Sequence, residues 1–217
     1  MNDYLLAIVL GIIEGLTEFL PVSSTAHLRI AEALLGVDLR NGYWKMFTIV
    51  IQLGAILCLP VYFRKRIAEF LASFPRGRKG DRTWLTHPLA LTLIAFVVTA
   101  GPSLTLVKVI GKHLESLLVM GTSLVVGGVI MWVVDAACGA PRPGRSFRTQ
   151  DMEEMSFLQA VWIGACQILS AVFPGTSRSM ATIAAGQVAG MTRASALEFS
   201  FFLSMPTMAA EIGRAHV

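Results

Sequence analysis

The sequence predicts an all-α integral membrane protein, a polytopic helical bundle with inverted-topology repeats and re-entrant, broken helices. Three observations support this fold class. The chain of 217 residues is 54% hydrophobic and 15% charged, whereas a soluble domain carries about 25% charged residues. The apolar residues form separate long runs, and the basic residues gather in the short segments between them, as in the loops of membrane proteins. Two of the runs resemble each other, and each ends in proline and a cluster of hydroxyl residues.

Six apolar segments divide the chain, and three of them are long enough to cross a bilayer as one helix. A full crossing needs about 20 apolar residues, which the second, third and fourth segments provide. The first and fifth segments each run into proline, so we expect broken helices there rather than simple spans. The segments lie at about 4–22, 46–63, 88–107, 116–135, 157–173 and 197–210.

Basic residues between the segments predict the orientation of the chain. Residues 64–82 contain seven lysines and arginines, and such a loop stays in the cytoplasm. The connection at 108–115 holds two lysines and the one at 136–156 holds three arginines, which predicts the outer and the cytoplasmic side respectively. Membrane orientation therefore explains the net charge of +4, and we expect no nucleic acid as a partner.

The cysteines and the chain ends need only simple interpretations. Cys58, Cys138 and Cys166 have no metal-type or disulfide spacing. Cys58 and Cys166 lie inside apolar runs, so we expect these two to be small buried hydrophobic residues. The N-terminal Met-Asn-Asp carries no positive charge, so the first apolar run is expected to belong to the mature fold. Residues 211–217 resemble the translation of a sequencing-adapter oligonucleotide. We expect them to be non-native, with the natural chain continuing beyond Ala210.

An internal repeat relates the first segment to the fifth. Gly-Ile-Ile-Glu-Gly-Leu-Thr-Glu-Phe-Leu-Pro-Val-Ser-Ser-Thr begins at Gly11, and Gly-Ala-Cys-Gln-Ile-Leu-Ser-Ala-Val-Phe-Pro-Gly-Thr-Ser-Arg begins at Gly164, in register without a gap. Three crossings separate the copies, so the second copy is inverted relative to the first. We expect one truncated membrane domain at 1–210, with repeat one at about 4–107 and repeat two at about 116–210. The two proline–hydroxyl turns then face each other across a polar cavity. Chance similarity of two apolar segments is the alternative.

Glu14 and Glu18 form an acidic pair inside the first apolar segment. Residues four apart lie on one face of a helix, and carboxylates at membrane depth are costly and usually functional. Two neighbouring carboxylates repel, so we expect a proton, a metal ion or a cationic side chain between them. A hydrated pair at the membrane surface is the alternative, which the apolar flanking residues argue against.

Hydroxyl residues and a histidine follow this acidic pair. Pro21 ends or kinks the first helix, and Ser23, Ser24 or Thr25 caps the next one, whose free N–H groups also form an anion site. His27 follows Ser24 by three residues on the same helical face, where it can act as a general base or acid. A purely structural histidine remains the alternative.

The second turn supplies hydroxyl groups and a permanent positive charge. After Pro174 and Gly175 come three hydroxyl residues with Arg178 among them, and a guanidinium matches the geometry of a phosphate group. An arginine that only reaches for the membrane surface is the alternative, but the register with the first turn favours phosphate binding. The hydroxyl residues are Thr176, Ser177 and Ser179.

Together these residue types favour phosphoryl transfer. That chemistry depends on positioning and on stabilising negative charge, and an activated hydroxyl can attack phosphorus. A secondary transporter or lipid flippase would also combine inverted repeats, broken helices and buried carboxylates, but it needs no nucleophile. A non-catalytic scaffold would leave the buried charges unexplained.

The motifs resemble those of the undecaprenyl pyrophosphate phosphatases, also called the bacitracin-resistance protein family. The first is Glu-Gly-Leu-Thr-Glu-Phe-Leu-Pro-Val-Ser-Ser-Thr-Ala-His from Glu14 to His27, and the second is Pro-Gly-Thr-Ser-Arg-Ser from Pro174 to Ser179. Segments 50–54 and 198–206 also resemble the sequence of this family, in the same order. The resemblance spans about residues 5–210. Ala26 stands where glycine is common in the family.

The resemblance implies a multi-pass enzyme of the bacterial plasma membrane whose site opens to the extracytoplasmic side. It implies hydrolysis of a polyprenyl pyrophosphate lipid, undecaprenyl pyrophosphate, for carrier recycling in peptidoglycan synthesis, with resistance to bacitracin. It also implies a divalent cation, Mg²⁺ or Ca²⁺, which Glu14 and Glu18 would hold. Ser24 and His27 match the nucleophile and base, in roles that stay open, and Arg178 matches the phosphate-binding arginine. A homodimer is one arrangement that the sequence allows.

Overall fold

The computed structural model confirms the all-α class. Its described residues contain helices and a single isolated β-bridge between Thr149 and Met191, and no strand. The helices are α1 (Asp3–Thr17), α2 (Ser24–Leu34), α3 (Gly42–Tyr62), α4 (Arg64–Ser73), α5 (Pro88–Ile110), α6 (Leu117–Cys138), the short 3₁₀-helix η1 (Met152–Glu154), α7 (Phe157–Val172), α8 (Arg178–Val188) and α9 (Arg193–Ala215). The structure describes residues 2–37, 42–77, 80–110, 116–140, 147–173 and 175–215.

Three helices of the described chain are long and apolar enough to cross a membrane. They lie at Gly42–Tyr62, Pro88–Leu106 and Leu117–Cys138, at the segments predicted to span. Only 11% of the third is buried within the protein, so α6 offers most of its surface to lipid. The chain is therefore a multi-pass membrane protein. The shorter α1 and α7, with 15 and 16 residues, are the two segments that were not expected to be simple spans.

Both copies of the repeat form helical hairpins. The first consists of α1, a turn over residues 18–22, and α2. The second pairs α7 with α8, and α2 and α8 have the same length of 11 residues. Pro174 lies outside the described residues, so its part in the second turn stays a prediction, as does the inverted relation of the two repeats.

The basic segment after α3 differs from the loop that the charge pattern suggests, because its first part forms a helix. Arg64 to Ser73 make up α4, since Arg, Lys, Glu, Ala and Leu are good helix formers. This helix buries Phe70 against α9, where Phe70 meets Phe202 at a ring-centroid distance of 5.4 Å.

Arg66 joins three elements at this end of the bundle. Its guanidinium donates two hydrogen bonds of 2.7 Å to Glu153 of η1 and one of 2.7 Å to Glu198 of α9. The helices α4 and η1 therefore lie on the same side of the bundle, which agrees with the prediction that the basic segments 64–82 and 136–156 share one side. The guanidinium also lies over the ring of Phe70, 4.7 Å from its centroid.

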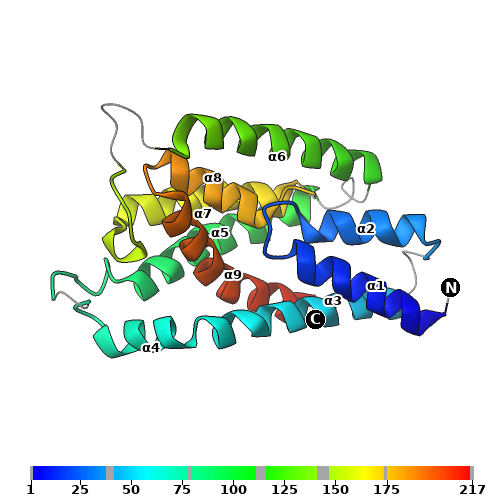
Figure 1. The fold of residues 1–217 in the computed structure, drawn as a ribbon, viewed down its shortest axis with the longest axis horizontal. Coiled ribbons are helices and arrows are strands. Elements are labelled where there is room, and N and C mark those ends of the chain that lie inside the picture. The colour runs from blue at the N-terminus through cyan, green and yellow to red at the C-terminus, as the bar shows by residue number, and fades with distance from the viewer. Residues whose placement is uncertain are drawn as a thin grey trace.

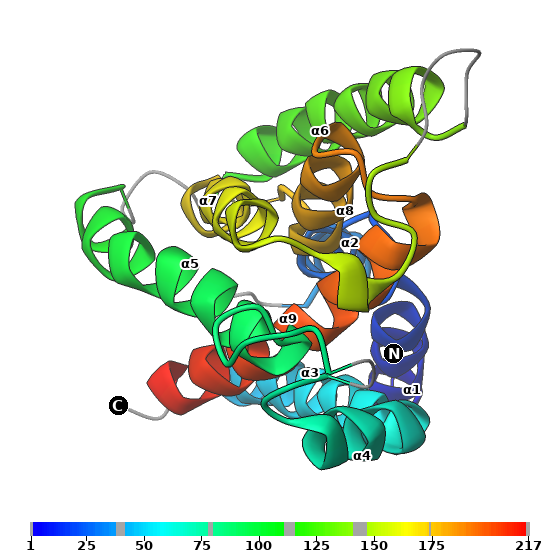
Figure 2. The ribbon, with the colours of Figure 1, turned by 90° about the vertical axis from the view of Figure 1, so that its left-hand side faces the viewer.

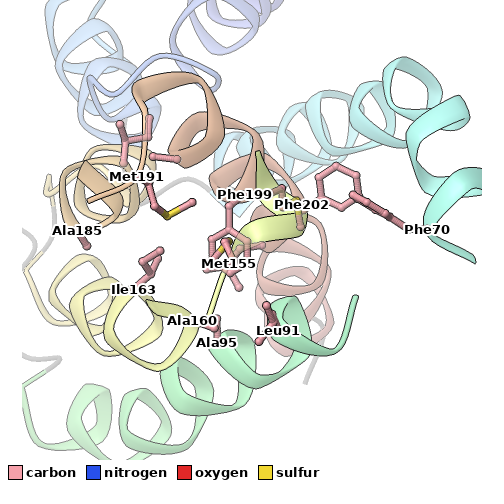
Figure 3. Packing of buried hydrophobic residues seen from close by; sticks show 14 residues of the cluster. Phe70, Leu91, Ala95, Met155, Ala160, Ile163, Ala185, Met191, Phe199 and Phe202 are labelled. Atoms are coloured by element: carbon pink, nitrogen blue, oxygen red, sulfur yellow. The ribbon is translucent and has the colours of Figure 1, made fainter. Parts of the chain in front are cut away.

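The main hydrophobic core lies between α5, α7, α8 and α9 (Figure 3). Gly164 of α7 allows this packing, because a Cβ atom there would come within 2.5 Å of the carbonyl oxygen of Ala95 in α5. A smaller cluster of Leu6, Leu10, Leu28 and Trp44 joins α1, α2 and α3.

The two halves of the chain interleave. The helix α9 packs against α3 and α5 of the first half, while α6 packs against α2 as well as α8. As a result, the N-terminal end of α8 points to the turn between α1 and α2 (Figure 1). This arrangement brings the two hydroxyl-rich turns together.

Candidate active site

The first turn begins where α1 ends and places Ser24 at the start of α2. Glu18 keeps helical dihedral angles and its N–H bonds to the carbonyl oxygen of Glu14. Ser23 has a φ of 64°, uncommon for a residue with a side chain, and its Oγ accepts a hydrogen bond from the N–H of Ala26. The strained Ser23 therefore caps α2, which turns the chain back so that Ser24 approaches Glu18.

The second turn depends on a glycine. Gly175 has a φ of 88°, and a Cβ atom there would lie 2.7 Å from the carbonyl oxygen of Met120, so only glycine fits. Ser177 then caps α8, accepting a hydrogen bond of 3.2 Å from the N–H of Met180.

A chain of hydroxyl groups joins the two turns. Ser179 Oγ donates to the carbonyl oxygen of Leu20 at 3.0 Å. Because its hydrogen is used there, Ser177 Oγ is the donor in the 3.0 Å bond between the two serines. The serines of the second turn thus hold it against the backbone of the first.

Glu18 is the centre of the site because its two oxygens bind groups from both turns. Oε2 accepts a hydrogen bond from Ser24 Oγ, and Oε1 accepts one of 2.5 Å from Nη2 of Arg178. The Glu18 side chain is only 8% exposed and that of Arg178 is 18% exposed. Such a charged hydrogen bond in a shielded place is stronger than a neutral one.

Glu14 lies beside Glu18, but its carboxylate differs from that of Glu18 in its hydrogen bonding. Its side chain is 1% exposed, and neither carboxylate oxygen has a hydrogen-bond partner among the described residues. It is close enough to Glu18, Arg178 and Ser24 to interact with their charges or dipoles. A buried carboxylate without a partner is costly, which indicates that a further group belongs there.

A polar cavity of about 110 Å³ opens next to Glu18, between the two turns and α3. The two helix N-termini at α2 and α8 both border it, and free N–H groups at a helix start attract anions. Ten of the residues that line the cavity have polar or charged side chains, so the space suits a charged head group. They are Glu18, Ser23, Ser24, Thr25, Gln52, Ser170, Thr176, Ser177, Arg178 and Ser179, together with Met208.

His27 is the predicted residue that the structure places differently. Its Nδ1 donates to the carbonyl oxygen of Ser23 at 2.8 Å, which leaves Nε2 as the free basic nitrogen. His27 lines a neighbouring cavity, which it shares with Ser177, while the hydroxyl of Ser24 is bonded to Glu18. The shared helical face of Ser24 and His27 therefore does not bring the two side chains into contact.

Ser170 and Met208 line the cavity although they were not candidate site residues, and Gln52 was noted only as part of the similar segment 50–54. Gln52 is half-buried on α3, where it is the single amide in an otherwise largely apolar helix. A polar residue in a membrane span is by default a sign of function, so this signal was present in the sequence. Ser170 donates to the carbonyl oxygen of Gln167.

The geometry can bind an anion and activate a hydroxyl group. Arg178 and two helix starts supply positive potential, and Glu18 is placed to take a proton from Ser24. Among the described residues, no group of three His, Cys, Asp or Glu side chains could hold a metal ion unaided. Glu14 and Glu18 therefore provide two carboxylates that could bind a cation, but not a complete set of protein ligands.

Comparisons with known proteins give one family model and several similar proteins. The family model described as "Bacitracin resistance protein BacA" matches residues 7–216. An "Undecaprenyl-diphosphatase" of Koribacter versatilis is 67% identical over 211 residues, which cover 96% of this chain and 71% of that protein. Two further proteins of the same name are similar: that of Caldanaerobacter subterraneus is 39% identical over 207 residues, covering 95% of this chain and 72% of its own, and that of Pseudomonas syringae pv. syringae is 40% identical over 203 residues, covering 93% and 68%.

Proposed function

The chain belongs to the bacitracin resistance protein family of undecaprenyl pyrophosphate phosphatases, and from this premise we propose that it hydrolyses undecaprenyl pyrophosphate to undecaprenyl phosphate and inorganic phosphate. The contact of Glu18 with both Ser24 and Arg178 at the polar cavity is the observation that best supports this activity. A transporter would need the buried charges, but not a hydroxyl held against a carboxylate.

The diphosphate head group lies in the polar cavity. Arg178 and the N–H groups at the starts of α2 and α8 stabilise the negative charge on its oxygens. Thr176 and Ser177 on one side and Ser23 and Thr25 on the other supply further hydrogen bonds. A phosphate oxygen replaces the Glu18 oxygen on Arg178, which frees that carboxylate for its second role.

Ser24 is the nucleophile that the geometry favours. Its proton passes to Glu18 as Oγ forms a bond to the terminal phosphorus, and the bond from that phosphorus to the bridging oxygen breaks. Undecaprenyl phosphate leaves as an anion. Water then cleaves the Oγ–phosphorus bond and releases inorganic phosphate, while the proton on Glu18 returns to Oγ. His27, with Nε2 free beside Ser177, is the alternative nucleophile or base.

The carboxylates of Glu14 and Glu18 suit a divalent cation. Both oxygens of Glu14 are buried without a partner in the described chain. Mg²⁺ typically binds one or two carboxylates together with phosphate oxygens of a substrate, so a third protein ligand is not required. Glu14 and Glu18 would hold Mg²⁺ or Ca²⁺, which when bound supplies positive charge to the phosphate oxygens.

The cellular role follows from the reaction. The basic segments mark the cytoplasmic end of the bundle, so we place the protein in the bacterial plasma membrane with its site open to the extracytoplasmic side. Undecaprenyl phosphate made there re-enters peptidoglycan synthesis as the lipid carrier. The description of the matching family model names bacitracin resistance, which we propose for this chain as well.

Phosphate release from a polyprenyl pyrophosphate by the purified chain in detergent tests this function. We expect release of inorganic phosphate with the polyprenyl monophosphate as the second product. Glu18→Ala, Ser24→Ala and Arg178→Ala should each lower the rate by orders of magnitude. Normal turnover in all three variants would refute the site. Movement of the lipid across liposomes without phosphate release would instead favour a flippase.

A further inference from the structure

Two larger apolar cavities border the polar one, and a lipid tail could enter either. The α8 groove, about 460 Å³ in volume, lies between α6 and α7 with α8 as its floor, and it shares Thr176 with the polar cavity. The α5 cavity, about 430 Å³, lies between α5, α7 and α9 and shares Ser170 with the polar cavity. In Figure 2, α6 lies above α8 and α7 lies beside it, and both helices pack against α8.

The α8 groove has a lining that suits hydrocarbon. Its walls include Val126 and Ile130 of α6 and Leu169 of α7. Two of its polar groups are already bonded within the protein: Thr122 Oγ1 donates to carbonyl oxygens of its own helix, and the indole N–H of Trp162 donates to the carbonyl oxygen of Ala185 at 3.1 Å. Among the described residues, no side chain that lines this groove has a buried nitrogen or oxygen atom without a partner.

The α5 cavity has a different chemistry. Gln167 Oε1 and Ser103 Oγ are buried there and have no hydrogen-bond partner among the described residues. Hydrocarbon in contact with these atoms would leave both unsatisfied, which is unfavourable for buried polar groups. Water satisfies such atoms, so this cavity suits water better than a lipid chain.

The α8 groove also has the right position and direction. It begins at Thr176 and Met180, beside the N-terminal end of α8, and extends to Val188 at the other end of that helix. A helix of 11 residues is about 16 Å long, so the groove holds the first few isoprene units and not a whole polyprenyl chain. Val126 and Ile130 are 57% and 47% exposed, so the tail can enter sideways from the bilayer.

We infer that the α8 groove binds the isoprene units of the polyprenyl tail next to the pyrophosphate, and so aligns the head group with Ser24 and Arg178. This inference rests on the proposed function for the identity of the substrate. It assigns Val126, Ile130, Leu169 and Met180 to substrate binding and leaves the α5 cavity without a lipid.

Two matched variants test the assignment. Val126→Trp narrows the α8 groove, and Leu104→Trp places the same side chain in the α5 cavity at a residue of similar exposure, 46%. Both are measured for phosphate release from geranylgeranyl pyrophosphate in detergent, and gel filtration confirms that each folds. We expect KM to rise about tenfold in Val126→Trp because the added ring competes with the tail for space. It should stay within about twofold in Leu104→Trp. A rise confined to Leu104→Trp, an equal rise in both, or no rise in either overturns the inference.

Photolabelling gives a readout that does not depend on turnover. Geranylgeranyl pyrophosphate with a diazirine in its first isoprene units is irradiated with the unsubstituted protein, and labelled peptides are identified by mass spectrometry. Labels on α6 and α8 that are lost in Val126→Trp support the groove, whereas labels on α5 and α9 refute it. Labelling of α6 and α8 without any phosphate release would refute the proposed function and keep the tail site.

Discussion

Glu18 Oε1 and Arg178 Nη2 lie 2.5 Å apart although the two residues belong to different repeats of the chain. The other oxygen of Glu18 accepts a hydrogen bond from the hydroxyl of Ser24, so one carboxylate connects the proposed nucleophile with the proposed phosphate-binding cation. In the proposed mechanism, a phosphate group that binds Arg178 in place of Glu18 frees Oε1 of that carboxylate, and phosphate binding is thereby coupled to proton transfer.

Arg178→Lys should lose most of the activity, although it keeps the positive charge. Lysine is a point charge and lacks the planar fork with which a guanidinium binds two oxygens at once. We expect kcat/KM for a polyprenyl pyrophosphate to fall roughly 100-fold or more, as for the loss of one donor to a developing charge. Arg193→Lys is the control, since Arg193 binds Asp135 away from the cavity. Comparable rates for the two lysine variants would contradict a bidentate role.

Ser24 should carry the phosphoryl group during turnover. A substrate labelled with radioactive phosphorus at its terminal phosphate is mixed with the protein and quenched in acid within milliseconds. Because Ser24 Oγ contacts Glu18 and His27 does not line the same cavity, we expect label that is stable in acid, as a serine ester is, and that is absent in Ser24→Ala. Label that is lost in acid and resists base would identify His27 as the nucleophile instead.

Glu14→Gln should weaken the dependence on the divalent cation. Removal of a residue that only orients a metal ligand lowers metal affinity about 10–100-fold. Glu14 is proposed to bind the cation directly, so its loss should have at least as large an effect. The Mg²⁺ concentration for half-maximal activity should therefore rise roughly tenfold or more. The increase in melting temperature on adding Mg²⁺ should also shrink. Gln167→Leu, at the matching position of the second repeat, is the control and should keep both responses. Unaltered Mg²⁺ titrations in Glu14→Gln would remove this residue from the cation site.

Much of the site could be predicted because its parts are adjacent in sequence. The gap-free alignment of the two repeats predicted that their turns lie next to each other. The hydrogen bond from Ser179 to the carbonyl oxygen of Leu20 confirms this contact. Hydropathy predicted α3, α5 and α6 as spans, since length and apolar content decide that property. The pairing of Ser24 with Glu18 was not predictable from helical spacing, because it depends on the strained Ser23 that turns the chain back.

Other features depend on contacts between distant segments. The basic segment at 64–82 was predicted only as a cytoplasmic connection, and the attachment of its helix α4 through Arg66 to Glu153 and Glu198 depends on residues far along the chain. Gln52 reaches the cavity because α9 packs against α3, which no local pattern encodes. The choice between the two apolar cavities depends on buried oxygens of Gln167 and Ser103 that have no partner among the described residues, and side-chain partners across helices cannot be predicted from one sequence.

His87 should make the stability of the protein fall in weak acid. It precedes α5, outside the membrane-spanning segment, and its side chain is fully buried between Phe70 and Phe74. Burial lowers the pKa of His87 below its usual value of about 6.5, and the nearby charge of Glu153 opposes this only in part. Nδ1 accepts the N–H of Leu89, so the ring is held in its neutral form with Nε2 donating to Ser73.

The direction of the pH effect on stability follows from the difference between the pKa of His87 in the unfolded chain and in the folded protein. The unfolded chain takes up a proton at His87 below about pH 6.5, whereas the folded protein does so only at a lower pH. The stabilisation is complete above pH 6.5 and declines as the pH falls towards the folded pKa, by about 1.4 kcal/mol for each unit of difference. We expect the melting temperature to drop between pH 7 and pH 5.5 in the unsubstituted protein. His87→Asn should melt lower at pH 7, since it loses packing, but show a flatter dependence. Parallel curves for the two proteins would mean that another group governs the acid response.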